Sequence, residues 1–342
     1  MPYYRAVLWT GKNRVEVQER SVSEPGPGEV VLRVRAAGIC GTDLHILSGT
    51  HPQAKPPLVP GHEFAGEVYE IGEGVEASYR NARVGADSYR GCGDCLFCRS
   101  GNRQLCEQGT CEYGINIDGG WQEFVVIPAA NLYRLPDSVS LVDAGAGCIL
   151  NCPMAAVEML GIEKGDRVLI LGDGPSSLVL LQLARIKGAG MVVVSGHRRR
   201  RLELAEELGA DQVINTHELN LADALGEHAG KLNVVVDAVG KSETMADALM
   251  VAGKRARVHL FGLPEGPLSE LPMDEFLWKE LTLTGSTGAP SLWPVAMDYL
   301  EQGSLRVAPI ISHHFSIEQA QEAVDYILRN PSEVVKAVFE FP

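Results

Sequence analysis

Residues 167–196 read RVLILGDGPSSLVLLQLARIKGAGMVVVSG, which is an apolar strand, a glycine-containing turn, a helix and a second apolar strand. Strands that are apolar throughout are typical of a parallel sheet covered on both faces, with the helix as the crossover. Helical stretches alternate with further predicted strands near residues 212–214, 234–237, 257–261 and 281–284. This alternation predicts a doubly wound parallel sheet, and therefore an α/β fold, in this half of the chain.

The segments on either side of this sheet differ in pattern. Short β-type runs, such as residues 4–9 and 30–35, are separated by turns rich in glycine and proline, which predicts a small antiparallel sheet or barrel. After the sheet, two helical stretches lead into VVKAVFEF, a strand-like run at residues 334–341. At 342 residues the chain is long for a single core, so we expect two domains.

Composition limits the partners and the compartment. The 30 basic and 44 acidic residues give a net charge of −14, which argues against nucleic acid or an anionic membrane as a partner. No apolar run approaches the roughly 20 residues of a membrane helix, and the N-terminus lacks the apolar core of a secretion signal. We therefore expect a cytoplasmic protein, in which eight cysteines indicate thiolates and metal ions rather than disulfides.

Residues 38–68, GICGTDLHILSGTHPQAKPPLVPGHEFAGEV, gather potential metal ligands in a loop-rich segment. Cys40, His62 and Glu63 offer a mixture of soft and borderline donors that suits zinc. Cys40 and His62 are too far apart for one local zinc knuckle, so two segments must converge. Two probable ligands, a carboxylate and a third ligand that is distant in sequence fit a catalytic zinc site better than a closed structural site, because a catalytic zinc keeps one coordination position open.

Residues 91–106, GCGDCLFCRSGNRQLC, predict a second metal site. Two residues separate each neighbouring pair among Cys92, Cys95 and Cys98, and Cys106 follows after seven more. Four thiolates this close can form a closed tetrahedral zinc site, which contributes folding stability rather than chemistry. Free or disulfide-paired cysteines are the alternative, and the spacing and the reducing compartment disfavour it.

GICGTDLH and GHEFAGEV together resemble the zinc motif of the medium-chain alcohol and polyol dehydrogenases, and the resemblance extends over nearly the whole chain. It implies a β-rich GroES-like catalytic domain and a Rossmann cofactor domain, with the C-terminal tail returning to the first. We therefore predict a discontinuous catalytic zinc domain, residues 1–155 and 290–342, with its four-cysteine zinc lobe at about 91–106. Residues 156–289 are predicted to bind the dinucleotide.

The resemblance also implies the ligands of a catalytic zinc. Cys40 and His62 match two of them. The third is Cys148, at the position where the family offers a cysteine or a glutamate, or else Glu63, which follows the histidine. Cys152 lies four residues beyond Cys148 and so on the same face of a predicted helix. We favour Cys148 over both rivals.

Three further residues match family residues near the zinc: two that relay a proton and one carboxylate that orients a zinc ligand. Thr42 and His45 would relay the proton of the alcohol to solvent. Asp43 would orient the His62 imidazole through its second nitrogen. The zinc would act as a Lewis acid that lowers the pKa of the alcohol, so that hydride can leave for the nicotinamide.

The turn GDGPSS, residues 172–177, follows a strand and opens a helix, as a dinucleotide site requires. Gly172 would permit the tight turn, and Gly174 the approach of the pyrophosphate to the helix N-terminus. Asp173 and Ser177 depart from the usual pattern, because one adds a charge and the other replaces the third glycine. The turn residues predicted to bind the cofactor are Gly172, Gly174, Pro175, Ser176 and Ser177.

The end of the second strand predicts which dinucleotide binds. An acidic residue there usually binds the adenosine ribose hydroxyls, but this chain has Gly196, followed by a histidine and four arginines. Glycine leaves room for a 2′-phosphate, and arginine can bind it bidentately, although arginines are also typical of a solvated helical turn. We predict NADP rather than NAD, bound by Arg198 first, with His197 and Arg199 behind it.

These patterns predict a zinc-dependent oxidoreductase that transfers hydride between a secondary alcohol or polyol and NADP, with one catalytic and one structural zinc. Relatives are commonly dimers or tetramers, so we expect a homodimer or homotetramer. One alternative is a polyol, cyclitol or threonine-type dehydrogenase that uses NAD, and another is a non-redox, zinc-stabilised binding protein of the same fold. His51, Trp121 and Asn151 are candidate pocket residues by position.

Overall fold

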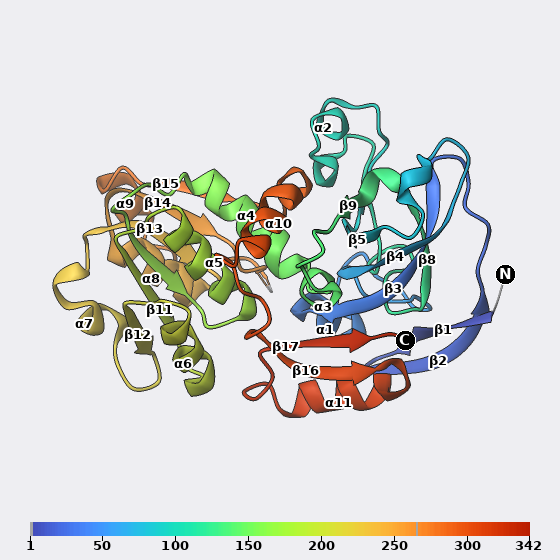
Figure 1. The fold of residues 1–342 in the computed structure, drawn as a ribbon. Coiled ribbons are helices and arrows are strands. Elements are labelled where there is room, and N and C mark those ends of the chain that lie inside the picture. Colours follow the sequence, from blue (N-terminus) through green and yellow to red (C-terminus); the bar gives the residue numbers. More distant parts are fainter. Residues whose placement is uncertain (1–2, 265) are drawn as a thin grey trace. The chain divides into compact units, whose positions relative to one another are not determined.

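The computed structural model describes residues 3–264 and 266–342 (Figure 1). The chain forms two compact units. The first comprises Met1–Cys148, Pro290–Gln302 and Val307–Pro342, and the second comprises Ile149–Ala289 and Gly303–Arg306. Within the described residues, no helix is both long enough and apolar enough to cross a membrane.

The second unit is built on a six-stranded sheet in the order β12-β11-β10-β13-β14-β15, in which every neighbouring pair is parallel. Its strands are β10 (Arg167–Leu171), β11 (Met191–Gly196), β12 (Gln212–Asn215), β13 (Leu232–Asp237), β14 (Ala252–Leu260) and β15 (Thr282–Gly285). The strand order reverses between β10 and β13, and open α/β sheets bind their ligands at such a switch point. The predicted doubly wound parallel sheet is confirmed.

Helices connect the parallel strands and pack on them, as parallel pairing requires. α5 (Pro175–Ile186) packs on β10 and β11, α6 (Arg199–Glu207) on β11 and β12, and α8 (Ser242–Val251) on β13 and β14. Apolar side chains from strands and helices form one core, which includes Leu169, Val193, Val235, Leu249 and Val258. The other helices of this part of the chain are α4 (Cys148–Leu160), α7 (Leu221–Leu225) and α9 (Met273–Trp278).

The first unit is rich in β structure, as predicted. Its seven-stranded sheet has the order β16-β17-β3-β4-β5-β9, with β8 also paired to β3. These strands are β3 (Glu29–Ile39), β4 (Phe64–Ile71), β5 (Arg83–Ala86), β8 (Phe124–Pro128), β9 (Leu132–Arg134), β16 (Ile311–Ser316) and β17 (Lys336–Glu340). The other strands of the unit are β1 (Tyr3–Gly11) and β2 (Arg14–Ser21), which form a hairpin, and β6 (Tyr89–Arg90) and β7 (Cys111–Glu112), which form a short ribbon. Its helices are α1 (Gly41–Ser48), α2 (Leu96–Arg99), α3 (Leu141–Gly145), α10 (Trp293–Glu301) and α11 (Ala320–Arg329).

The C-terminal strand β17 pairs antiparallel with β3, so that Ala337 lies opposite Ile39 and Val338 opposite Gly38. A segment from the end of the chain therefore borders the strand that leads into Cys40. On its other side, β3 pairs antiparallel with β4, and Ala37 faces Phe64. These two pairings bring residues 40, 62–63 and 336 to the same edge of the sheet.

Residues 141–160 form two helices, α3 and α4, with a break at 146–147. A Cβ on Gly147, within this break, would lie 2.7 Å from Trp293 Cη2. The indole requires a glycine at this point, and the chain changes direction there before α4 begins.

Candidate functional site

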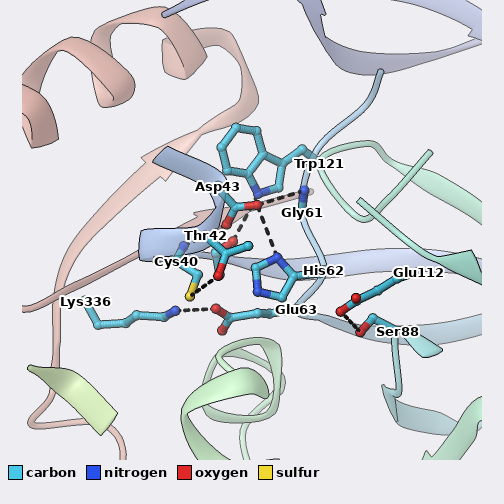
Figure 2. A network of polar contacts seen from close by, with 11 residues as sticks. Cys40, Thr42, Asp43, Gly61, His62, Glu63, Ser88, Glu112, Trp121 and Lys336 are labelled. Carbon is cyan, nitrogen blue, oxygen red and sulfur yellow. Dashed lines mark hydrogen bonds and ion pairs between the residues drawn. The ribbon is translucent and has the colours of Figure 1, made fainter. Parts of the chain in front are cut away.

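Four potential metal ligands from three segments converge in the first unit, and Figure 2 shows three of them, Cys40, His62 and Glu63. Cys40 follows β3, His62 and Glu63 precede β4, and Cys148 begins α4. One donor atom from each lies within 4.8 Å of those of the other three. Two thiols, an imidazole and a carboxylate form a donor set suited to zinc. The antiparallel pairing of β3 with β4 explains how Cys40 meets His62 and Glu63, although they are distant in sequence.

Asp43 connects Cys40 and His62 through hydrogen bonds. The His62 Nδ1–H donates to Asp43 Oδ1 at 3.3 Å, which leaves Nε2 available to a metal. Asp43 is fully buried, and it also accepts the Gly61 amide at 3.3 Å and, through Oδ2, the Cys40 amide at 2.8 Å. A single carboxylate therefore fixes the position of Cys40 and the orientation of His62.

Lys336, which no sequence pattern indicated, lies at the cluster. Its Nζ donates to Glu63 Oε1 at 2.6 Å (Figure 2), and both side chains are buried, with 1% and 0% exposure. Burial raises the pKa of Glu63 to about 7, although the Lys336 ammonium opposes that shift. The other oxygen, Oε2, sits where a Cβ on Gly38 would be 2.5 Å away, so Gly38 is required for the carboxylate to fit.

The two residues expected to relay a proton lie in α1. Thr42 Oγ1 is 4.0 Å from Cys40 Sγ, which places the hydroxyl beside the cluster. His45 Nδ1 is 3.4 Å from Thr50 Oγ1, at the exposed end of the helix. In the described part of the chain, no hydrogen bond joins Thr42 to His45 directly. The structure thus brings Thr42 to the cluster and His45 toward solvent.

Glu112 in β7 is a second polar residue that the sequence did not single out. Its carboxylate accepts the Ser88 hydroxyl at 3.1 Å, and Figure 2 shows the pair beside His62. Burial raises the pKa of Glu112, while the nearby His62 opposes the shift. Trp121, expected in the pocket, is fully buried, donates from Nε1 to the Gly38 carbonyl at 3.0 Å, and supports the ligand loop instead.

The four cysteines of the predicted zinc lobe also come together. The sulfur atoms of Cys92, Cys95, Cys98 and Cys106 lie within 4.8 Å of one another, and none forms a disulfide. Backbone amides donate to these sulfur atoms, for example Cys92 N to Cys106 Sγ at 3.3 Å. The amide of Cys98 lowers the pKa of Cys95 to about 6, which favours the thiolate form that binds metal. The arrangement fits a closed tetrahedral site.

Cys152, the rival of Cys148, is placed differently. Its thiol donates to the Thr287 carbonyl at 3.3 Å, and the ligand cluster of the described residues contains Cys148 instead. Cys111, outside the four-cysteine pattern, is exposed in β7. The structure therefore separates both cysteines from the two groups of potential ligands.

The glycine turn after β10 has the geometry of a phosphate-binding turn. Gly172 has a φ of +113°, a conformation that favours glycine. A Cβ on Gly174 would meet nothing within 4 Å, so a ligand has free access to the start of α5, where unpaired amides favour an anion. Ser177 is buried in the first turn of α5, and its small side chain is accommodated at the position of the usual third glycine.

The Asp173 carboxylate turns toward the end of β11. Its Oδ2 accepts the amides of His197 and Arg198, each at 2.8 Å, and its Oδ1 accepts Arg198 Nη1 at 2.9 Å. Burial alone would raise the pKa of Asp173, but these amides and guanidinium groups outweigh it and hold the pKa below its usual value. The negative charge is therefore already partnered within the protein.

The residues after β11 differ in how they are held. Arg198 is fixed by Asp173, whereas Arg199 is 90% exposed and pairs with Glu203 at 2.9 Å. Arg201 is buried and lies 3.6 Å from Asp173 Oδ1, which the sequence did not indicate. The His197 ring stacks on that of His217, with centroids 4.6 Å apart.

A cluster of zinc-type ligands on a β-rich unit and a phosphate-binding turn at the switch point of a parallel sheet define a metal- and dinucleotide-dependent dehydrogenase. Residues 26–137 match the alcohol dehydrogenase GroES-like domain, and residues 177–302 match the zinc-binding dehydrogenase domain. The chain belongs to the family of zinc-dependent medium-chain alcohol and polyol dehydrogenases.

Individual relatives resemble the chain over nearly its full length. L-threonine 3-dehydrogenase of Pyrococcus horikoshii is 34% identical over 332 residues, which cover 95% of this chain and 94% of that enzyme. A zinc-binding dehydrogenase of Sinorhizobium meliloti 1021 bound to NADP is similar with a TM-score of 0.92 and 31% identity, over 100% of both chains. The alcohol dehydrogenase rspB of Escherichia coli CFT073, complexed with NADH, has a TM-score of 0.93 and 29% identity over 100% of both chains.

The family membership establishes a zinc-dependent oxidoreductase with a nicotinamide dinucleotide as cofactor. It disfavours the alternative of a non-redox binding protein on the same fold. One solved relative holds NADH and another NADP. The choice between the two cofactors must therefore be argued from the residues of this chain.

Proposed function

We propose that this protein transfers hydride between the carbinol carbon of a polar secondary alcohol or polyol and NADP. The observation that carries the proposal is the four-ligand cluster, together with the buried groups that hold it. If three of the four side chains bind the metal and the fourth is bound by another residue, a tetrahedral zinc keeps one coordination position for substrate. The zinc would supply Lewis acidity toward the alcohol oxygen.

Charge balance supports Cys40, His62 and Cys148 as the zinc ligands. Two thiolates neutralise a divalent cation, and His62 adds a neutral donor. Glu63 already has a buried counter-ion in Lys336, 2.6 Å away. Buried charges are stable when they are paired, so we assign Glu63 to the Lys336 ion pair and not to the metal. Thr42, beside Cys40, would take the alcohol proton and pass it toward His45 and solvent.

Glu112 and Ser88 support a polar substrate over a simple alkyl alcohol. A half-buried carboxylate with the Ser88 hydroxyl as its hydrogen-bond partner can accept a further hydrogen bond from a second hydroxyl or from an ammonium group. A threonine-type amino alcohol is the second candidate, because its ammonium group would complement that carboxylate. The likeness to the L-threonine 3-dehydrogenase of Pyrococcus horikoshii is in keeping with this candidate.

Steady-state kinetics test the cofactor and the reaction together. With an alcohol or polyol identified by a screen for reduced-cofactor absorbance, kcat/KM for NADP should exceed that for NAD by about 10- to 100-fold. That ratio corresponds to about 1.5–3 kcal/mol for a hydrogen bond to a charged group. Equal or better use of NAD would refute the NADP assignment, and an absence of turnover with every alcohol would refute the reaction.

The four-cysteine lobe is proposed to hold a structural zinc. Replacement of Cys95 by serine should lower the zinc content from about two ions per chain to about one and reduce the thermal midpoint, because binding to a structural site adds folding free energy. Mass spectrometry of metal in purified protein measures the content. Cys111→Ser is the matched control, since that cysteine is exposed and outside the lobe. Unchanged zinc content in Cys95→Ser would contradict the assignment.

We also propose that the protein is a homodimer or homotetramer that uses the free edge of β15. Trp278 and Leu277 of α9 are 76% and 68% exposed, and Leu283 of β15 is 43% exposed. Unpaired strand edges and exposed apolar groups favour pairing with a second copy. Light scattering should give two or four chains per particle, and Trp278→Glu should shift the mass toward one chain. A monomeric natural protein would contradict the proposal.

A further inference from the structure

The Asp173 side chain occupies the volume that a side chain at position 196 would need, at the carboxyl end of β11. A Cβ on Gly196 would lie 2.5 Å from Asp173 Oδ2, closer than real Cβ atoms approach their neighbours. Gly196 has no positive φ, so its backbone would accept another residue if the space were free. The carboxylate on the glycine turn therefore requires the glycine at the strand end, and the space that Gly196 was expected to leave for a 2′-phosphate is filled by Asp173. Asp173 and Gly196, two of the three departures from the usual dinucleotide pattern, are one structural feature.

The Asp173 carboxylate has little remaining capacity to bind ribose hydroxyls, because hydrogen bonds occupy three of its acceptor positions. A carboxylate offers about four acceptor positions. Oδ2 accepts two backbone amides at 2.8 Å each, and Oδ1 faces Arg198 Nη1 at 2.9 Å and Arg201 Nη1 at 3.6 Å. Asp173 therefore does not replace the ribose-binding acid that Gly196 lacks, although its carboxylate occupies the same end of β11.

Arg198 and Arg201 together carry two positive charges against the single negative charge of Asp173. The Arg198 guanidinium is held by Nη1, and its Nε is buried without a hydrogen-bond partner among the described residues. A guanidinium has five N–H groups, and the Arg198 side chain is 26% exposed, so donors other than the buried Nε and the Asp173-bound Nη1 remain for an anion. A side chain that is already fixed loses less conformational entropy when it binds a ligand.

We propose that Asp173 is a positioning residue that holds Arg198, with Arg201 behind it, as a receptor for the 2′-phosphate of NADP. The proposal rests on the NADP preference proposed above. Hydrogen bonds from two backbone amides keep Asp173 ionised. The carboxylate, which belongs to the glycine turn, then holds the Arg198 guanidinium in place. Specificity for the phosphate then depends on a residue of the glycine turn as well as on the residues that follow β11.

Two possible roles of Asp173 predict opposite changes in the affinity for the 2′-phosphate when the carboxylate is removed, so one measurement distinguishes them. If the carboxylate only neutralises the arginines, its removal should strengthen phosphate binding. If it positions Arg198, its removal should weaken phosphate binding. Titration calorimetry of the full chain with 2′,5′-ADP and with 5′-AMP separates the phosphate from the rest of the adenosine site, and it needs neither turnover nor an identified alcohol.

The natural protein should bind 2′,5′-ADP at least about tenfold more tightly than 5′-AMP. Asp173→Ala should lose about tenfold in affinity for 2′,5′-ADP, the effect of one charge-assisted hydrogen bond, with 5′-AMP affinity unchanged. The matched control is Asp211→Ala, because Asp211 also binds a β11 amide, that of Val192, at 2.7 Å and pairs with an arginine, Arg185. That variant should keep the natural preference for 2′,5′-ADP.

A swap variant, Asp173→Gly with Gly196→Asp, keeps a carboxylate in the same volume. It therefore provides a second test if Asp173→Ala does not fold. Its carboxylate would extend from the strand end, where acids bind ribose hydroxyls, and its preference should move to 5′-AMP. Unchanged or tighter binding of 2′,5′-ADP by Asp173→Ala or by the swap variant would overturn the positioning role while the NADP preference stands. A natural protein that does not discriminate between the two nucleotides would overturn both.

Discussion

Serine in place of Cys40 is expected to lower kcat/KM for any alcohol substrate by roughly a thousandfold or more. Lewis-acid stabilisation by a bound metal is worth several kcal/mol, and each 1.36 kcal/mol is about tenfold in rate. Cys40 supplies one of the donor atoms that lie within 4.8 Å of one another, and a serine hydroxyl is a poor zinc ligand beside a thiolate. Steady-state kinetics with NADP and the alcohol measures the loss.

Two controls separate this effect from general damage. Cys152→Ser changes a thiol that donates to the Thr287 carbonyl, and it should leave the rate within about twofold. In Cys40→Ser itself, the four-cysteine lobe should retain its zinc, and the affinity for the dinucleotide should be unchanged, because neither depends on Cys40. Natural activity in Cys40→Ser would rule out the zinc mechanism.

The fold was largely predictable because its determinants are local in sequence. Continuous apolar runs such as that of β10, separated by helical stretches, are sufficient to indicate a parallel sheet. The four cysteines at residues 92–106 fall in one loop, so their spacing alone indicated that they would meet. Cys40 and His62 were also recognisable, since residue types with few other roles occur in a loop-rich segment.

The groups that support the site were not predictable in the same way. Lys336 lies in β17, and the pairing of β17 with β3 that brings it to Glu63 joins positions about 300 residues apart. The only available signal was the lysine near the start of the strand-like run VVKAVFEF. Glu112 lacked even that, because a two-residue strand such as β7 has no periodicity to interpret.

The glycine turn shows how a correct observation can be incompletely interpreted. Asp173 and Gly196 were each recognised as departures from the usual pattern, Asp173 because it adds a charge and Gly196 because it replaces the acid and so favours NADP. The contact between them makes them a compensating pair. Such compensation between the ends of adjacent strands requires coordinates, since parallel neighbours in a sheet are separated by a full crossover.

Methionine in place of Lys336 is expected to destabilise the protein and to reduce turnover. Removal of one partner from a buried ion pair costs about 3–5 kcal/mol, which lowers the thermal midpoint by on the order of 10 °C. The released Glu63 carboxylate, already within 4.8 Å of the other ligand atoms, would then be free to occupy the coordination position intended for substrate. Thermal unfolding, zinc content and kcat are the three measurements, and zinc should be retained.

The double variant Glu63→Gln with Lys336→Met distinguishes an ion-pair effect from loss of the lysine side chain itself. Because replacement of both charges of a buried pair is often nearly neutral in free energy, most of the lost stability should return. Turnover should rise with it, since glutamine is a weak competitor for zinc. Lys231→Met, which breaks an exposed pair with Glu227, should cost at most about 1 kcal/mol. If the double variant were no better than Lys336→Met, then Lys336 would act through packing alone, and Glu63 would again be a candidate zinc ligand.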